Sequence, residues 1–198
     1  MGGILQLFDF ILHIDAYLFL LIQDYGIWIY AILFLIIFVE TGLVFMPLLP
    51  GDSLLFAAGT FCAGVMQENE MAQLNLWVVL SLLIVAAISG DAVNYLIGKH
   101  FGLKLAKVKI KNYQLINDKH LDKTHAFFEK HGPKTIIIAR FVPIVRTFAP
   151  FVAGIAQMRY PTFFRFNAFG GTIWVISLTL LGYFFGNLSF VRENFETV

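Results

Sequence analysis

Apolar side chains fill five long stretches of this chain, and charged residues are scarce inside them. The stretches are Ile27–Val39, Ser53–Met66, Leu76–Gly98, Thr135–Ala156 and Phe166–Val191. A helix needs roughly 20 apolar residues to cross the hydrocarbon core of a bilayer. The pattern therefore predicts membrane helices, and we expect an all-α integral membrane protein.

The first 24 residues predict a helix that lies on the membrane surface. Their polar side chains project onto one helical face, and nearly all the others are Leu, Ile, Phe or Tyr. These polar residues are Gln6, Asp9, His13, Gln23 and Asp24. A short spanning helix is the alternative. Because this segment contains no Lys or Arg, we expect no cleaved signal peptide.

Two apolar stretches are interrupted by helix-breaking residues. The first predicted crossing is Tyr25–Val39, and the breakers that follow it are Pro47, Pro50 and Gly51. In the second half the breakers are Pro143, Pro150 and Gly154. Each proline removes a backbone donor and clashes with the preceding turn. Broken backbone is tolerated at membrane depth only where protein or a water-filled cavity satisfies its polar groups. We therefore predict re-entrant segments at 41–66 and 135–157.

The second half repeats the first in outline. Phe45-Met46-Pro47 and Phe56-Ala57-Ala58-Gly59 match Phe141-Val142-Pro143 and Phe151-Val152-Ala153-Gly154, at offsets of 96 and 95 residues. Leu96-Ile97-Gly98 with Phe101-Gly102 likewise matches Leu181-Gly182 with Phe185-Gly186. Chance similarity among apolar residues is the alternative. If the two broken segments enter from opposite sides, the halves form inverted repeats, which are typical of transporters.

These patterns predict one polytopic membrane domain over residues 1–198. Its parts are an interfacial helix at 1–24, a first half at 25–98, a basic cytoplasmic segment at 99–134 and a second half at 135–198. The paired glycines at 98/102 and 182/186 permit close helix packing, either within one chain or in a homo-oligomer.

Composition and charge agree with a membrane protein. Hydrophobic residues make up 59% of the chain and charged residues 14%, against roughly 45–50% and 25% in soluble domains. All 14 Lys and Arg residues lie at or after Lys99, and nine lysines fall between Lys99 and Lys134. Positive loops stay in the cytoplasm, so 99–134 should face inside and the acidic loop Gln67–Asn75 outside. No recognition motif accompanies the lysines, so we expect no nucleic-acid partner.

Four charged residues lie within apolar surroundings: Glu40, Asp52, Arg140 and Arg146. A charge at the membrane centre costs roughly 2.5–3.5 kcal/mol, so such residues usually mark function. Breaks in the backbone allow Glu40 and Asp52, and likewise the two arginines, to converge on one cavity. Two guanidiniums suit a phosphate or carboxylate, and the acids could exchange protons. The alternative is that the four charges only neutralise one another as buried ion pairs.

A second polar pair, Asp91 and Asn94, lies in the stretch Leu76–Gly98 and is a possible secondary site. Asn94 and backbone groups are the expected partners of Asp91 if its role is structural. Cys62 is the only cysteine, which excludes an internal disulfide and a cysteine-rich metal site. With no ligand-like spacing and no His/Asp pair in the broken segments, we expect no metal, no cofactor and no enzymatic activity.

The stretch from Glu40 through PLLPGD to FAAG, together with ARFVPIVRTFAPFVAG, resembles the DedA family of bacterial inner-membrane proteins. The resemblance covers nearly the whole chain and is greatest to the proton-dependent members linked to membrane homeostasis. It implies two re-entrant helices and four essential charges, which map onto Glu40, Asp52, Arg140 and Arg146. The chain ends at Val198, where relatives usually continue into another hydrophobic helix and a basic tail, so the C-terminal topology is left open.

The resemblance also implies a function. We expect a multi-pass protein of the bacterial inner membrane that uses the proton-motive force to move an anionic lipid. Undecaprenyl phosphate is the substrate best associated with the family. Arg140 and Arg146 would hold the head group, while Glu40 and Asp52 would take and release protons. A proton-coupled antiporter of small cations or drugs and a membrane scaffold without transport are the alternatives.

Overall fold

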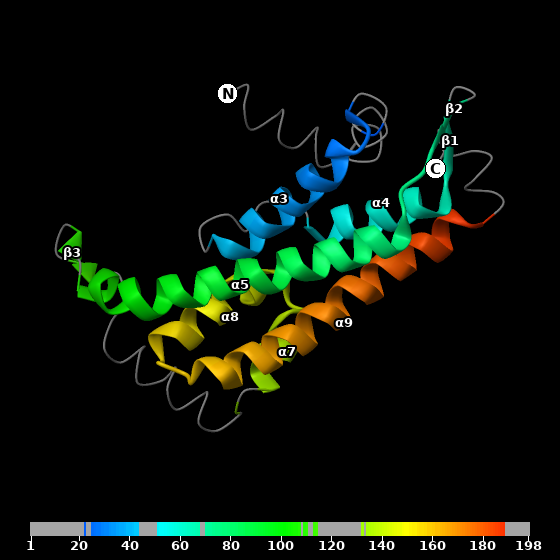
Figure 1. Ribbon diagram of the computed structural model, residues 1–198. Helices are drawn as coiled ribbons and strands as arrows, with labels where there is room; N and C mark the ends of the chain where they lie inside the picture. Colours follow the sequence, from blue (N-terminus) through cyan, green and yellow to red (C-terminus); the bar gives the residue numbers. More distant parts are fainter. Residues whose placement is uncertain are drawn as a thin grey trace. The chain divides into compact units, whose positions relative to one another are not determined.

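The structure is a computed structural model that describes residues 22, 25–43, 51–67, 70–107, 109–110, 113–114, 132 and 134–188. Its helices are α3 (Trp28–Gly42), α4 (Gly51–Ala63), α5 (Leu76–Lys107), α7 (Lys134–Ala139), α8 (Pro143–Ile155) and α9 (Tyr160–Gly186), as Figure 1 shows. Two short antiparallel hairpins accompany them, β1 (Val65–Gln67) with β2 (Glu70–Ala72) and β3 (Lys109–Ile110) with β4 (Tyr113–Gln114). The chain is thus predominantly helical, as predicted.

Two of these helices are long and apolar enough to cross a membrane. They are Leu76–Gly102 within α5, and α9. The predicted crossing that ends at Gly98 is longer than expected, because α5 continues to Lys107. α9 begins at Tyr160 rather than Phe166, since Pro161 fits the first helical turn, where its missing N–H has no helical partner to lose. With 15 residues, α3 is shorter than an ordinary spanning helix.

Several predicted features fall outside the described residues. They include the interfacial helix at 1–24 apart from the helical Ile22, the helix breakers Pro47 and Pro50, and most of the basic segment at 99–134. Gly51, the third breaker of that segment, is the first residue of α4.

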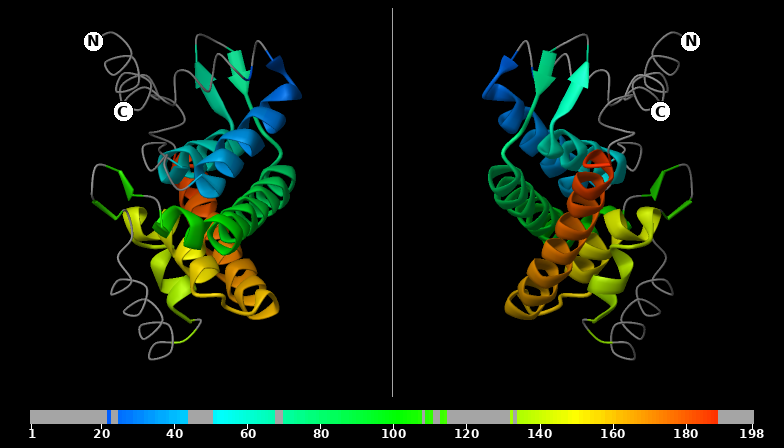
Figure 2. Two further views of the ribbon diagram at one scale, coloured as in Figure 1. Left: turned by 90° about the vertical axis from the view of Figure 1, so that its left-hand side faces the viewer. Right: turned by 90° about the vertical axis from the view of Figure 1, so that its right-hand side faces the viewer.

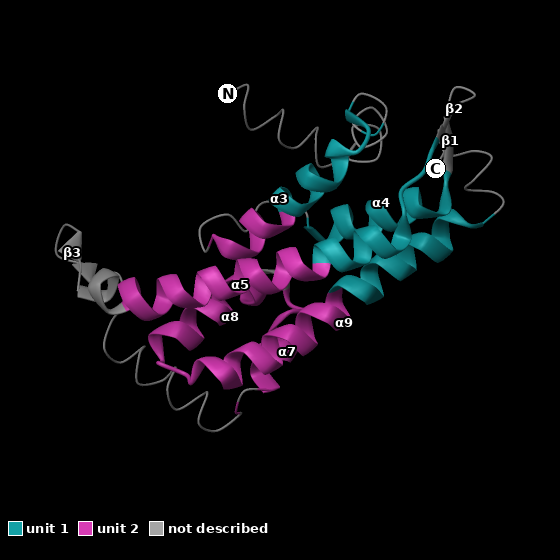
Figure 3. Ribbon diagram, viewed as in Figure 1, with its two compact units in different colours: residues 1–36, 49–83, 175–198 teal, residues 37–48, 84–174 magenta. Residues whose placement is uncertain are grey.

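The chain forms two compact units, shown in Figure 3. The first contains residues 1–36, 49–83 and 175–198, and the second contains residues 37–48 and 84–174. Each unit therefore takes segments from both halves of the sequence.

In the first unit, α4 packs against the C-terminal part of α9, and Figure 2 shows the two helices side by side. A Cβ on Gly59 would overlap the carbonyl of Thr179, and one on Gly182 would overlap the carbonyl of Phe56. The Thr60 hydroxyl donates a hydrogen bond of 3.2 Å to the Gly182 carbonyl. The backbones approach this closely only because both crossing positions are glycine.

The start of α5 is also fixed within the first unit. Asn75 is its N-cap, because the side-chain Oδ1 accepts hydrogen bonds from the backbone N–H groups of Trp77 and Val78 at 3.0 and 3.2 Å. The backbone N–H of Asn75 donates to the Tyr30 hydroxyl at 2.9 Å. These contacts join the first turn of α5 to α3.

In the second unit, α8 packs against α5 in the same manner. A Cβ on Gly154 would overlap the Tyr95 carbonyl, and one on Gly98 would overlap the Phe151 carbonyl. Tyr95 also stacks on Phe163 of α9, with ring centroids 4.4 Å apart, and its hydroxyl donates to the Met158 carbonyl. Tyr95, Ala153 and Phe163 are fully buried and belong to one apolar cluster of this unit.

Candidate functional site

A break between α7 and α8 places two arginines near each other. Pro143 is the first residue of α8, and a residue before proline is pushed out of the helical region. Val142 accordingly has φ −115° and ψ 105°, so the chain is extended there. Arg140 follows the last residue of α7, and Arg146 lies in the first turn of α8. Pro150, predicted as a second breaker, lies inside α8 without ending it.

Arg146 forms a buried ion pair with Glu40 near the end of α3. Its Nη2 donates to Glu40 Oε1 at 2.6 Å, and the side chains are 5% and 1% exposed. Such a pair is costly to desolvate and strongly destabilising to break on one side only. The structure therefore brings together one acid and one base of the four charges that the sequence singled out.

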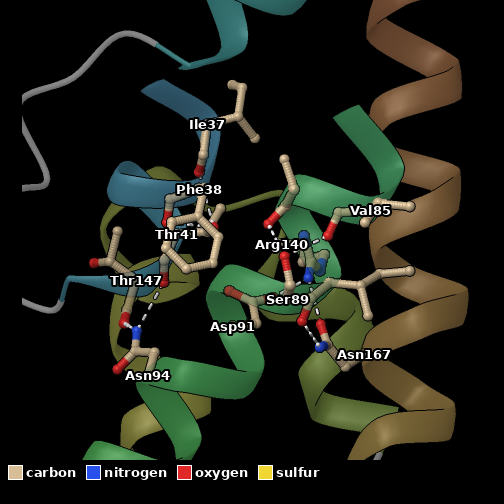
Figure 4. Close-up of polar contacts among 12 residues, drawn as sticks. Ile37, Phe38, Thr41, Val85, Ser89, Asp91, Asn94, Arg140, Thr147 and Asn167 are labelled. Atoms are coloured by element: carbon tan, nitrogen blue, oxygen red, sulfur yellow. Dashed lines mark hydrogen bonds and ion pairs between the residues drawn. The ribbon is translucent and has the colours of Figure 1, made fainter. Parts of the chain in front are cut away.

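Arg140 forms a second buried ion pair, with Asp91 of α5. Its Nη2 donates to Asp91 Oδ2 and also to the side-chain oxygen of Asn167 on α9. The amide nitrogen of Asn167 in turn donates to the Ile88 carbonyl at 3.1 Å. Figure 4 shows Arg140, Asp91 and Asn167 converging from three segments. The secondary candidate Asp91 thus pairs with an arginine rather than with Asn94.

Trp174 of α9 lies beneath both guanidiniums. The Cζ atom of Arg146 is 4.6 Å from the centroid of its ring, and that of Arg140 is 5.8 Å away. Both distances lie within the range of a cation–π contact. Trp174 is itself 2% exposed, so this contact is desolvated. The two arginines, whose like charges repel, thus both lie over the same aromatic ring.

Asn94 connects three helices beside these pairs. Its amide nitrogen donates to the carbonyls of Thr41 on α3, at 3.1 Å, and Thr147 on α8, at 2.8 Å, as Figure 4 shows. The Thr41 hydroxyl donates to the Ile37 carbonyl at 2.8 Å. Asn94 therefore holds α3 and α8, which carry the paired residues Glu40 and Arg146, against α5.

Asp52 is the fourth charge that the sequence singled out, and it belongs to the first unit. It lies in the first turn of α4 and is half-buried. An acidic residue there is favourable, because the N-terminus of a helix carries a partial positive charge.

The second unit therefore holds two acids and two arginines in two buried pairs. Asn167 and Trp174 also belong to this cluster and were not predicted. Asn167 carried a signal, as a polar residue in an apolar stretch, whereas an apolar ring such as Trp174 gives none. Among the residues that the structure describes, no group of His, Cys, Asp and Glu could hold a metal ion.

Comparisons with known proteins identify relatives of this chain. A family model described as the VTT domain matches residues 49–184. Protein DedA of Escherichia coli strain K12 is 54% identical over 190 residues, which cover 96% of this chain and 84% of that protein. An uncharacterized membrane protein of Mycobacterium leprae is 44% identical over 163 residues, covering 82% and 69%. The inner membrane protein YqjA of Escherichia coli K12 is 36% identical over 160 residues, covering 80% and 68%.

No solved structure is significantly similar to the chain. The relatives are named as membrane and inner membrane proteins, and α5 and α9 are long and apolar enough to span a bilayer. The predicted location is therefore confirmed: this is a multi-pass protein of the bacterial inner membrane.

Proposed function

This chain belongs to the VTT-domain family, which includes the DedA proteins, and on that premise we propose that it is a proton-motive-force-dependent transporter of an anionic lipid. Undecaprenyl phosphate is the proposed substrate, and support of the cell envelope is the proposed role. The observation that carries this proposal is the buried ion pair between Glu40 and Arg146.

The nitrogen that holds Glu40 is the one that a phosphate needs. A guanidinium can grip a phosphate with two parallel hydrogen bonds through either of two edges, and both edges include Nη2. In Arg146 this nitrogen donates to Glu40 Oε1. Nη2 has two hydrogens, and one of them is held by Glu40, so Glu40 occupies one of the two edges. A lipid phosphate that grips Arg146 through that edge competes with the Glu40 carboxylate for this donor.

This competition supplies a route to proton coupling. When Glu40 is protonated it is neutral and accepts hydrogen bonds only weakly, so Arg146 can bind a phosphate instead. When Glu40 loses the proton, its carboxylate binds Arg146 again and displaces the lipid. Trp174 keeps its contact with the guanidinium in both states, because a cation–π contact has no single required acceptor. Asp52 is proposed as a second proton-carrying residue.

We also propose that the two broken segments are the re-entrant parts of an inverted repeat. The crossings inside the two units support this, because Phe56 and Gly59 of α4 correspond to Phe151 and Gly154 of α8 at the sequence offset of 95. Gly59 faces the Thr179 carbonyl of α9 as Gly154 faces the Tyr95 carbonyl of α5. The carbonyls of Phe56 and Phe151 in turn face Gly182 and Gly98. Equivalent contacts in two units are expected of a true repeat and not of chance similarity.

Reconstitution tests the proposed function. The purified full chain would be placed in vesicles of phosphatidylethanolamine and phosphatidylglycerol that contain fluorescent undecaprenyl phosphate, with and without an imposed proton gradient. We expect movement of the lipid that depends on the gradient, and its loss in Arg146→Gln. In Glu40→Gln the response to the gradient should be lost.

The alternatives give different results in the same vesicles. Proton flux driven by a small cation in the absence of polyprenyl phosphate would indicate an antiporter. A folded protein that moves neither lipid nor protons would indicate a scaffold. We propose no enzymatic activity and no metal or organic cofactor; the proposed partners are protons and membrane lipids.

A further inference from the structure

We propose that the two buried arginines have different tasks: Arg146 binds the anionic head group, whereas Arg140 is a positioning residue locked by Asp91, Asn167 and the backbone of α9. The task that this division gives to Arg146 rests on the proposed function. The fixed state of Arg140 rests on its own contacts and is testable without any lipid.

The contacts of Arg140 leave it no edge with which to grip a phosphate. Nη2 carries two hydrogens, and this nitrogen donates to both Asp91 and Asn167. Both gripping edges of the guanidinium include Nη2, so both are occupied. The other nitrogens, Nε and Nη1, are buried and have no hydrogen-bond partner within the described part of the chain, but they lie on different edges and form no fork.

The backbone of α9 fixes the same guanidinium from a third side. A Cβ on Gly171 would lie 3.2 Å from Nη2 and 3.3 Å from Cζ of Arg140, and one on Gly170 would lie 3.4 Å from its Cδ. The side chain thus rests directly on the helix at two adjacent glycines. To turn toward a lipid, Arg140 would have to leave Asp91, Asn167 and this slot together.

Arg140 acts on Arg146 through Trp174 and through charge. Its guanidinium lies over the ring that supports Arg146, so it helps to fix the plane of that ring. Asp91 on α5 lies within electrostatic reach of both arginines, and Arg140 lies within electrostatic reach of Arg146. The Asp91–Arg140 pair is neutral as a whole, so its own field at Arg146 is small, and the titration of Glu40 acts directly on Arg146 through their shared hydrogen bond.

A matched pair of conservative variants tests this division. Arg140→Lys and Arg146→Lys both keep the positive charge, and lysine cannot form the two parallel bonds of a guanidinium. In the vesicle assay we expect Arg146→Lys to raise the apparent KM for polyprenyl phosphate by about tenfold or more. We expect Arg140→Lys to lower the maximal rate and to leave KM within about threefold of the unchanged protein. An equal rise of KM in both variants would overturn the proposal.

Trp174 supplies a second measurement that needs no substrate. In a protein that carries Trp28→Phe and Trp77→Phe, both at exposed positions, the emission of Trp174 reports the cation above its ring. We expect this emission to change with pH, to lose that change in Glu40→Gln and to keep it in Arg140→Lys. If Glu40→Gln does not fold, the double variant Glu40→Gln/Arg146→Gln replaces it.

The two measurements separate the possible failures. The division of tasks would be refuted if the pH dependence of the Trp174 emission were lost in Arg140→Lys and kept in Glu40→Gln. It would also be refuted if the emission did not depend on pH at all. The expected emission in a protein that moves no polyprenyl phosphate would leave the fixed state of Arg140 standing and would refute the proposed function, and with it the head-group task of Arg146.

Discussion

Glu40 and Arg146 are 106 positions apart in the sequence, yet they are joined by a hydrogen bond of 2.6 Å in the interior of one unit. The bond links the last turn of α3 to the first turn of α8. A buried charge without a partner of opposite sign is strongly destabilising, so each helix supplies the partner that the charge on the other helix needs. The pair is therefore both a contact that fixes the packing and the candidate for a proton-dependent exchange.

Removing one member of this pair should cost more than removing both. We expect Glu40→Ala to lower the free energy of unfolding by about 3–5 kcal/mol, because it leaves the Arg146 charge buried without its carboxylate. In the double variant Glu40→Gln/Arg146→Gln no charge remains buried there, and most of that loss should be recovered. Thermal unfolding in detergent, monitored by circular dichroism, measures the stability of both variants. A double variant less stable than Glu40→Ala would contradict this account.

Asn94 gives a second prediction about stability. Its amide satisfies the carbonyls of Thr41 and Thr147, and leaving a buried acceptor unpaired costs about 1–3 kcal/mol. Asn94→Asp keeps the shape but lacks the donor, so we expect it to unfold at a lower temperature than the unchanged protein. Asn187→Ala is the matched control, because the amide of Asn187 makes one exposed hydrogen bond, to the Tyr183 carbonyl. Equal effects in the two variants would show that Asn94 does not join the helices.

Much of the fold follows from the sequence because its signals are local. A continuous apolar stretch predicts α5, and Pro143 predicts the break that puts Arg140 and Arg146 near each other. These features depend on backbone geometry within a few residues. The short hairpins β1–β2 and β3–β4 were not predicted, because each strand has only two or three residues and too little pattern to detect.

The pairing of charges could not be predicted in the same way. The sequence grouped Glu40 with Asp52 and Arg140 with Arg146, because each pair flanks one break. In the second unit each of these arginines pairs with an acid from a different helix, and one of the two acids is Asp91, which the sequence indicated only as a secondary candidate. Such pairing depends on which helix faces pack together over long separations in the chain. Only an alternative interpretation of the sequence, neutralisation by buried ion pairs, anticipated that acids and arginines would meet.

The glycines at the two helix crossings should be equally intolerant of a methyl group. Gly59→Ala and Gly154→Ala would each drive a Cβ into a backbone carbonyl of the facing helix, and overpacking of this kind costs about 1–3 kcal/mol. Gly42→Ala is the control, since its Cβ would lie 3.5 Å from the nearest atom, the Gly90 carbonyl oxygen. Thermal unfolding should show two similar losses and little change in the control. A silent Gly59→Ala beside a damaging Gly154→Ala would argue against equivalent crossings.

Two replacements of Trp174 should distinguish the effect of its aromatic ring from the effect of its side-chain volume. Trp174→Leu removes the π face over which Arg146 lies. Because this contact is kept with and without lipid, its loss acts by misplacing the guanidinium, and we expect the apparent KM for polyprenyl phosphate to rise by less than the roughly 30-fold that about 2 kcal/mol would give if the contact formed only on binding. Trp174→Phe keeps a smaller ring and should raise the apparent KM for polyprenyl phosphate by less. Trp77→Leu, at a position that is 77% exposed, controls for the loss of a tryptophan as such. If Trp174→Phe and Trp174→Leu raised KM equally, the ring would act only by filling space, and the cation–π contact would not be what positions Arg146.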